Sequence, residues 1–311
     1  MPMMNQVRRQ TIAVTGANGW IGARFCTMAE ARGHRVRPVR RESLLATSAS
    51  AQALAGCDYL VHLAALVHQS NAAVSPDDYQ QANVELTRRL AKAAGDAGIQ
   101  RFVLVSSVKV MGERTAGPVD ENQPPDPSDD YARSKLQAER LLLNAEQPWP
   151  FEVVIARPPL VYGPGVRANF RVLLRAAESR WPLPLAEAQA PRSMIYLDNL
   201  VDALLFLCEA PGAAGQILFV SDGRNLTVAD LIRAIRANRQ RPARLFAIPE
   251  ALLRLLAQAA RIVGVGSGSA GIDRLFNPLQ ISIDAIRKLG WTPPVGFEQA
   301  LAETLNESKK S

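Results

Sequence analysis

A short apolar run followed by three closely spaced glycines constrains the fold of this chain more than any other feature. The run Thr11–Thr15 is rich in β-branched residues and leads directly into a turn with the spacing GxxGxxG. A helical pattern then continues to Gly33. Strand, glycine-rich turn and helix form the context that a dinucleotide-binding turn requires, because glycines let backbone N–H groups approach a pyrophosphate. We expect cofactor contacts from Gly16, Asn18, Gly19, Trp20, Ile21 and Gly22.

The second predicted strand, 35–41, bears on which dinucleotide is bound. It ends in Arg40 and Arg41, whereas NAD-selective sites place an acidic residue here to bind the ribose 2′-hydroxyl. An arginine suits the 2′-phosphate of NADP. We therefore predict NADP(H), with Arg40 at the phosphate and NAD(H) as the alternative. A solvated charge pair is the competing interpretation of these arginines.

Two further apolar runs predict buried parallel strands. Residues 60–65 follow an alanine-rich helical stretch, and their small side chains would allow a ribose or nicotinamide to approach Leu63, Ala64 and Ala65. We expect His62, within this strand, to be structural. Residues 101–106 form the next strand, and Ser106 and Ser107 follow at its carboxyl end, where open α/β sheets bind ligands.

Tyr131 and Lys135 lie one turn apart on a helix predicted for residues 131–146, so they share one face. A free tyrosine titrates near ~10, and a neighbouring ammonium favours the phenolate. Lowering that pKa by roughly 3 units would take roughly 4 kcal/mol and would make Tyr131 a usable acid or base near neutral pH. By itself, YxxxK also fits an ordinary helix surface.

Together these motifs resemble the extended short-chain dehydrogenase/reductases. The likeness rests on GxxGxxG, on the serine pair after a central strand, on YxxxK and on the run RPPLVYGPG at 157–165. It covers nearly the whole chain, down to Leu-Gly-Trp at 289–291. The chain is most similar to the branch that acts on nucleotide sugars, which includes UDP-galactose 4-epimerases and UDP-4-keto-hexosamine reductases.

The resemblance implies roles for individual residues. Tyr131 would be the acid/base, Lys135 would lower its pKa and bind the nicotinamide ribose, and Ser107 would hold the substrate oxygen. Asn83 and Pro158 would lie on the cofactor side, and Asn169, Arg192 and Arg274 would bind the nucleotide and its diphosphate. Two departures stand out: Met111 replaces a tyrosine common in the family, and residues 43–56 lack the acidic residue expected near adenine.

The predicted fold class is α/β, with a Rossmann-type doubly wound parallel sheet over 1–165. A smaller, mostly helical substrate lobe follows over 166–311, with 192–222 rejoining the sheet. Asp198 and Asp202 are expected to begin a helix, since acids favour a first turn. The apolar stretch 251–265 is too short and too charged to span a bilayer. It predicts an amphipathic helix on the core, with a helix on a membrane surface as the alternative.

Composition excludes several classes of protein. The 311 residues are 48% hydrophobic and can bury a large core. The net charge is +7, but the basic residues are scattered, which favours an anionic small molecule over nucleic acid. Cys26, Cys57 and Cys208 are widely spaced, as expected for reduced thiols of a cytoplasmic protein without a secretory signal. No cysteine or histidine cluster suggests a metal site. Relatives pair through a four-helix interface, so a homodimer is compatible with the chain.

The resemblance therefore implies hydride transfer to or from C4 of a nucleotide-linked hexose, with UDP as the expected nucleotide. A 4-keto-sugar reductase or dehydrogenase of surface-polysaccharide precursor synthesis is the first hypothesis. A 4-epimerase with retained NAD is the alternative. Dehydration is disfavoured, because Val108 and Lys109 stand where a carboxylate pair would follow Ser107. A non-catalytic NADP-binding sensor or scaffold is a remote alternative, since such proteins commonly lose the tyrosine or lysine.

Overall fold

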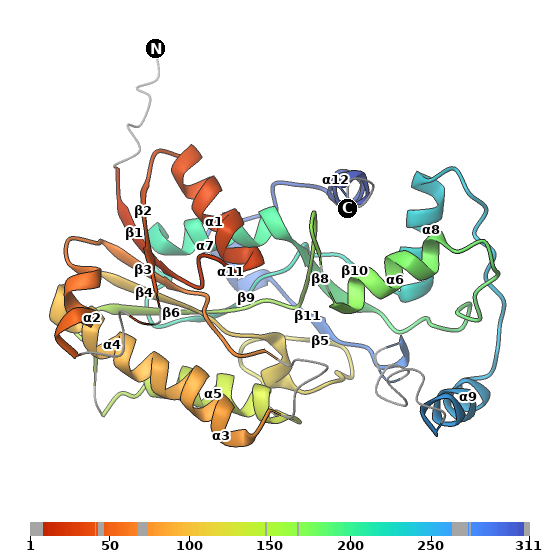
Figure 1. The fold of residues 1–311 in the computed structure, drawn as a ribbon, viewed down its shortest axis with the longest axis horizontal. Helices are drawn as coiled ribbons and strands as arrows, with labels where there is room; N and C mark the ends of the chain where they lie inside the picture. Colours follow the sequence, from red (N-terminus) through yellow and green to blue (C-terminus); the bar gives the residue numbers. More distant parts are fainter. Residues whose placement is uncertain are drawn as a thin grey trace, which may run out of the picture.

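A six-stranded parallel sheet forms the centre of the computed structural model, which describes residues 9–40, 42, 47–67, 74–146, 148–166, 168–262, 273 and 275–307. The strand order is β2-β1-β3-β4-β6-β9 (Figure 1). The strands are β1 (Thr11–Thr15), β2 (Arg35–Val39), β3 (Tyr59–His62), β4 (Arg101–Val105), β6 (Glu152–Arg157) and β9 (Ile217–Phe219). The chain moves outward from β1 to β2 and then crosses to β3, so the switch point where such sheets bind ligands lies between β1 and β3.

Helices cover both faces of this sheet (Figure 1). One face is covered by α1 (Trp20–Ala31), α7 (Leu197–Glu209) and α11 (Asp284–Lys288). The other is covered by α2 (Thr47–Leu54), α4 (Leu86–Ala97) and α5 (Asp130–Leu142). Strand β4 is buried along its whole length, as expected for a parallel strand covered on both faces. The predicted doubly wound parallel sheet is confirmed.

Strand β2 is the outer strand of the sheet, which differs from the usual dinucleotide-binding order 3-2-1-4-5-6. After β2 the described chain contains α2 and then β3, which pairs with β1. Within the described residues no strand lies outside β2.

A smaller, mostly C-terminal region has its own core. Two small sheets, β10-β8-β7 and β11-β5, contain the remaining short strands. They are β5 (Pro118–Val119), β7 (Leu160–Tyr162), β8 (Arg192–Tyr196), β10 (Asn225–Leu226) and β11 (Gln280–Ile281). The helices are α6 (Ala168–Glu178), α8 (Val228–Asn238), α9 (Glu250–Ile262) and α12 (Phe297–Glu307). Within 192–222, β9 lies in the six-stranded sheet beside β6, whereas β8 pairs with β7 and β10. The division of the chain at residue 165 stays a prediction.

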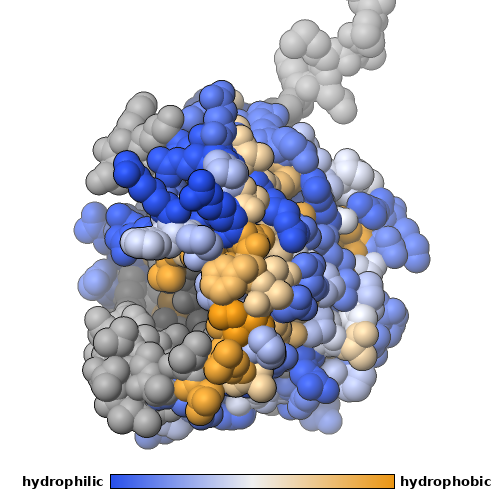
Figure 2. Space-filling model, turned by 90° about the vertical axis from the view of Figure 1, so that its right-hand side faces the viewer, coloured by the Kyte–Doolittle hydropathy of each residue, from blue (hydrophilic) through white to orange (hydrophobic). Residues whose placement is uncertain are grey.

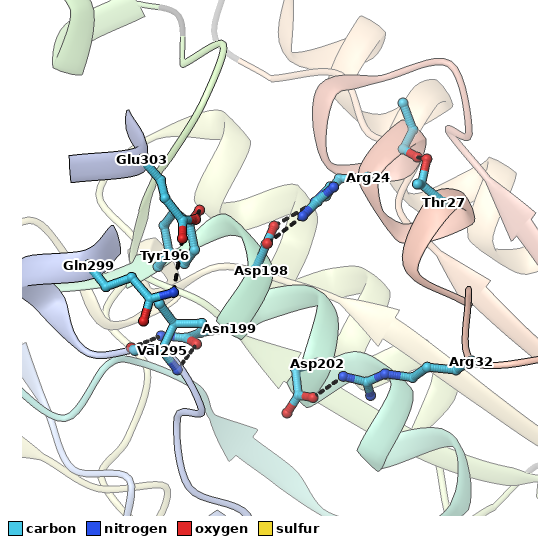
Figure 3. A network of polar contacts seen from close by, with 11 residues as sticks. Arg24, Thr27, Arg32, Tyr196, Asp198, Asn199, Asp202, Val295, Gln299 and Glu303 are labelled. Carbon is cyan, nitrogen blue, oxygen red and sulfur yellow. Dashed lines mark hydrogen bonds and ion pairs between the residues drawn. The ribbon is translucent and has the colours of Figure 1, made fainter. Parts of the chain in front are cut away.

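Two ion pairs join α1 to α7 across the sheet's covered face (Figure 3). Arg24 donates two hydrogen bonds to Asp198, at 2.6 and 2.5 Å, and Arg32 pairs with Asp202. Asp198 lies in the first turn of α7, as the sequence predicted, and Asp202 lies one turn further along. These carboxylates therefore hold two helices together.

Candidate active site

The glycine turn after β1 is fixed by close backbone packing. Gly16 has φ +70°, and a Cβ there would lie 2.8 Å from the backbone nitrogen of Ala64. A Cβ on Gly22 would lie 2.1 Å from the carbonyl oxygen of Gly16. Gly19 precedes α1, whose N-terminus carries neither a capping side chain nor an acidic residue in its first turn. The open N–H groups of this turn therefore fit a pyrophosphate.

The other residues predicted for this turn lie in different surroundings. Asn18 is exposed, and Ile21 packs against the core with its backbone in the first turn of α1. The indole Nε1 of Trp20 donates to the carbonyl oxygen of Pro164 at 2.7 Å. Trp20 thus ties the glycine turn to the loop that follows β7.

A cavity of about 330 Å³ opens at the carboxyl ends of β1, β2 and β3. Several lining residues have small side chains, which keeps the cavity open. Arg40 is exposed and directly follows the lining residue Val39. Leu63 packs against the core. Position and size suit part of a dinucleotide, so the described residues fit the predicted cofactor. The lining residues are Thr15, Gly16, Val39, Ala64, Ala65, Leu66, Asp78, Gln81, Ala82 and Leu86.

A buried hydrogen-bond chain holds the end of β3 beside this cavity. The Thr87 hydroxyl donates to the carbonyl oxygen of Asn83 at 2.6 Å, so it accepts from His62 Nε2 at 3.1 Å. His62 Nδ1 then accepts from the Thr15 hydroxyl at 2.6 Å, and that oxygen accepts from the Ala64 N–H at 3.2 Å. Burial, with the nearby Lys135 charge, lowers the pKa of His62 to about 3. His62 is therefore neutral and structural.

Asn83 lies in a π-helical turn, η2 (Gln80–Glu85), between α3 (Pro76–Tyr79) and α4. The π turn interrupts an otherwise α-helical stretch, and π turns of this kind are frequent at functional sites. The Asn83 amide donates to Leu66 O at 3.1 Å and to Ser134 Oγ at 2.9 Å, and it accepts from Leu66 N at 2.7 Å. Asn83 thus joins the loop after β3 to α5, and a cofactor contact from it stays a prediction.

Helix α5 brings Tyr131 next to Ser107. The helix begins at Asp130, where Asp129 accepts from the Ala132 N–H, and ends at Leu142, four residues earlier than predicted. The Tyr131 ring meets Tyr79 edge-on, with centroids 6.3 Å apart. Burial raises the pKa of Tyr131 to about 12, although a hydrogen bond with Ser107 lowers it. The predicted lowering is therefore wrong for the protein alone, because removal from water outweighs the favourable contacts.

Lys135 is buried one turn after Tyr131, and burial lowers its pKa to about 8. The carboxylate of Glu139, one turn further on, raises that pKa. Glu139 in turn forms two hydrogen bonds with Arg157 at the end of β6, at 3.0 and 2.6 Å, and both side chains are 2% exposed. Arg157 also donates to the Met111 sulfur at 3.3 Å. Met111 therefore packs on this ion pair.

Ser107 caps the short helix η3 (Val108–Met111) and accepts from the Lys109 N–H at 3.2 Å. The Lys109 ammonium pairs with Asp129 and, at 2.8 Å, with Glu113. Because Asp129 also caps α5, this pair joins the serine segment to the tyrosine helix. The place of a dehydratase carboxylate thus holds a cation that is already paired.

Ser106, the first residue of the serine pair after β4, is a structural residue by the family resemblance. Its hydroxyl is buried at the carboxyl end of β4 and has no hydrogen-bond partner among the described residues. Pro158 lies buried opposite, and its carbonyl oxygen accepts from Val108 N at 2.9 Å. An unpaired hydroxyl here is a candidate donor to a bound ligand, and its position at the end of a central strand was the signal available in the sequence.

The predicted nucleotide-binding residues are only partly described. Arg192 begins β8 and donates to the carbonyl oxygen of Asn277 at 2.6 Å. Asn169 lies in α6, but its side chain falls outside the described residues, as does the whole of Arg274. The structure therefore leaves the predicted diphosphate site untested.

A second cavity, of about 460 Å³, lies at the amino ends of the strands, beside Tyr59, Arg101 and Glu152. Parallel sheets of this kind bind ligands at the opposite end. The Arg101 guanidinium is already paired with Glu152 and donates to carbonyl oxygens at the C-terminal end of α7. We therefore assign no role in the chemistry to this cavity.

Comparison with known proteins agrees with the geometry. A family profile described as the NAD dependent epimerase/dehydratase family matches residues 12–220. The chain is 35% identical over 251 residues to a UDP-glucose 4-epimerase of Vibrio cholerae, covering 79% of this chain and 75% of that one. It is also 30% identical over 230 residues to 4-hydroxy-2-methyl-3-oxo-4-farnesyl-3,4-dihydroquinoline-1-oxide ketoreductase of Stigmatella aurantiaca, covering 68% and 67%.

Among solved structures, RMD from Pseudomonas aeruginosa complexed with NADPH superimposes with a TM-score of 0.75 at 23% identity. The match covers 97% of this chain and 98% of that one. A likeness at this level of identity shows the fold. No helix in the described part of the chain has the length and apolar character needed to cross a membrane.

Proposed function

Because the chain belongs to the NAD-dependent epimerase/dehydratase family of extended short-chain dehydrogenase/reductases, we propose that it reduces the 4-keto group of a nucleotide-linked hexose. UDP is the proposed nucleotide and NADPH the proposed cofactor. The observation that carries the proposal is the placement of Tyr131, which hydrogen-bonds with Ser107 at the carboxyl end of the sheet and lies one helical turn from the buried Lys135. A neutral phenol is a proton donor, and reduction of a ketone requires one.

Each residue has a distinct task in this proposal. The nicotinamide would supply the hydride to C4. Tyr131 donates its proton to the keto oxygen, and the Ser107 hydroxyl orients that oxygen by a second hydrogen bond. Lys135, buried one turn away, binds the ribose and keeps a positive charge beside the phenol. Proton and hydride must converge on one carbonyl, which requires the residues to be held in place before reaction.

Arg40 supports NADPH as the donor. It is exposed directly after β2, beside the cavity, where NAD-selective sites carry an acidic residue. Replacing it by glutamine should weaken NADPH binding while leaving NADH binding unchanged. Arg35→Gln is the matched control, because Arg35 is exposed at the opposite end of the same strand. Equal affinity of the wild-type protein for NADH and NADPH would contradict the assignment.

A 4-epimerase is the second candidate, and the Vibrio cholerae relative supports it. The deciding experiment is to purify the protein without added cofactor, denature it and identify any released nicotinamide nucleotide. Stoichiometric NAD would indicate a retained cofactor and favour the epimerase. An empty site that binds NADPH more tightly than NADH would support the reductase, and turnover of UDP-4-keto-hexoses would then be followed by NADPH absorbance.

A further inference from the structure

Five large hydrophobic side chains are exposed in the C-terminal region, and we call them the apolar strip. Trp181 is 78% exposed, an unusual value for tryptophan, which proteins generally bury. Figure 2 views the molecule from the side of α6, α8 and α9 and shows hydrophobic residues gathered in a strip between hydrophilic ones. The other members are Val172 at 64%, Phe246 at 44%, Leu252 at 45% and Leu255 at 61%. Contiguous exposed apolar residues mark interaction surfaces.

The backbone holds this surface rigidly. The buried guanidinium of Arg236 donates to carbonyl oxygens of both loops that carry the strip, those of Ala177, Ser179, Trp181, Pro242 and Arg244. Leu183 N bonds to the Arg244 carbonyl at 2.9 Å, and Phe246 N bonds to the Leu183 carbonyl at 3.1 Å. Trp181 and Phe246 are therefore presented to solvent from two loops that are bonded to one another.

Arginines flank the members of the strip in the sequence. The stretches 171–182 and 239–255 contain seven arginines and only two carboxylates. Five of these arginines are exposed and form no ion pair within the described part of the chain: Arg171, Arg175, Arg180, Arg241 and Arg244. Arg241 donates a hydrogen bond to the carbonyl oxygen of Glu178. Tryptophan and leucine flanked by arginine is the pattern of surfaces that lie on anionic lipid, because the side chains enter the headgroup region while guanidiniums meet phosphates.

We propose that this face docks the molecule on a bilayer that contains anionic phospholipids, with Trp181 and Leu255 inserted and the arginines on lipid phosphates. A second copy of the chain fits less well, since a two-fold contact would place the same arginines against one another. The sequence left open whether residues 251–265 pack on the core or on a membrane. In the structure Leu253 is buried while Leu252 and Leu255 are exposed to solvent, so only one face of α9 packs on the core.

The proposal does not depend on the substrate, so it is tested on the whole protein without substrate. Flotation should show binding to vesicles of phosphatidylcholine mixed with phosphatidylglycerol, weaker binding to phosphatidylcholine alone, and loss of binding as salt rises. Trp181→Ser combined with Leu255→Ser should lower the partition coefficient roughly tenfold or more. Arg175→Gln combined with Arg244→Gln should also lower it roughly tenfold or more on anionic vesicles.

Arg35→Gln combined with Arg140→Gln is the matched control, because it removes the same charge from exposed positions on β2 and α5. Its binding should equal that of the wild type, and all variants should keep the wild-type melting temperature. The proposal would be overturned if the wild type bound neither kind of vesicle. It would also be overturned if the control variant lost binding to the same extent, or if the Trp181 and Leu255 substitutions left binding unchanged. A wild-type dimer in sedimentation that Trp181→Ser dissociates would reassign the strip to self-association.

Discussion

The hydroxyl of Tyr131 is the single group on which the proposed chemistry depends. Tyr131→Phe removes the proton donor and keeps the ring that packs on Tyr79, so kcat should fall by roughly 10²- to 10⁴-fold. Cofactor affinity, measured by titration, should stay near the wild-type value. Tyr79→Phe is the control, since it removes a hydroxyl from the neighbouring ring. Turnover by the Tyr131→Phe variant at the wild-type rate would contradict the proposed mechanism.

The Ser106 hydroxyl should lower the stability of the ligand-free protein and contribute to ligand binding. This buried hydroxyl lacks a partner in the described structure, and an unsatisfied buried group costs roughly 1–3 kcal/mol. Ser106→Ala should therefore raise the free energy of unfolding of the cofactor-free protein by about 1 kcal/mol. It should also weaken binding of cofactor or substrate. Urea unfolding and binding titrations check both, and a variant that binds as tightly as the wild type would show that Ser106 contacts no ligand.

At the scale of the elements, the Glu139–Arg157 pair connects α5 to β6. Glu139→Gln leaves a buried guanidinium without its counter-ion, so it should destabilise the protein by roughly 3–5 kcal/mol in urea unfolding. Adding Arg157→Met should recover part of this loss, because a paired apolar replacement removes the unpaired charge. Failure of the second change to recover stability would argue against the ion pair as the cause.

The same substitution has an electrostatic consequence and a matched control. Glu139 raises the pKa of Lys135, so Glu139→Gln should lower that pKa further, and the pH dependence of turnover should shift toward acid. Glu152→Gln removes a carboxylate that pairs with Arg101 but is 51% exposed. Its cost should stay within about 1 kcal/mol, since Glu152 is half exposed and Arg101 keeps its hydrogen bonds to the carbonyl oxygens of Leu207, Cys208 and Ala210.

The elements that the sequence predicted are those that neighbouring residues determine. The glycine turn and the Tyr131 helix depend on local spacing, and both stand where the sequence placed them. Asn83, in the π turn, bonds to Leu66 and Ser134, which are distant in the sequence. Spacing placed Glu139 on the Tyr131 face, but nothing local indicated that Arg157 would meet it.

For the whole molecule, the direction of the Tyr131 pKa could not be read from YxxxK. The YxxxK spacing indicates that a lysine is near the tyrosine. The pKa of Tyr131 also depends on how far the assembled fold shields the phenol from water. The apolar strip could not be predicted from the sequence for the same reason. Its members come from α6, two loops and α9, and a leucine in an amphipathic helix does not reveal whether the core or the solvent faces it until the layers are assembled.

The His62 chain spans β1, β3 and α4, so protonation of this ring should act on global stability. The folded protein lowers the pKa of His62 to about 3, whereas an unfolded histidine titrates near ~6.5. The contribution of neutral His62 to the free energy of unfolding is fully present at pH values above the pKa of the unfolded histidine. This contribution is lost as the pH falls from about 6.5 toward 3, at roughly 1.4 kcal/mol per pH unit.

Between pH 6.5 and 5 the free energy of unfolding should therefore fall by roughly 2 kcal/mol more in the wild type than in His62→Gln. The variant loses hydrogen bonds to Thr15 and Thr87 and should be less stable at pH 7. The two stability curves then converge as the pH falls. Urea unfolding at several pH values measures this, and parallel curves would mean that His62 is already charged in the folded protein.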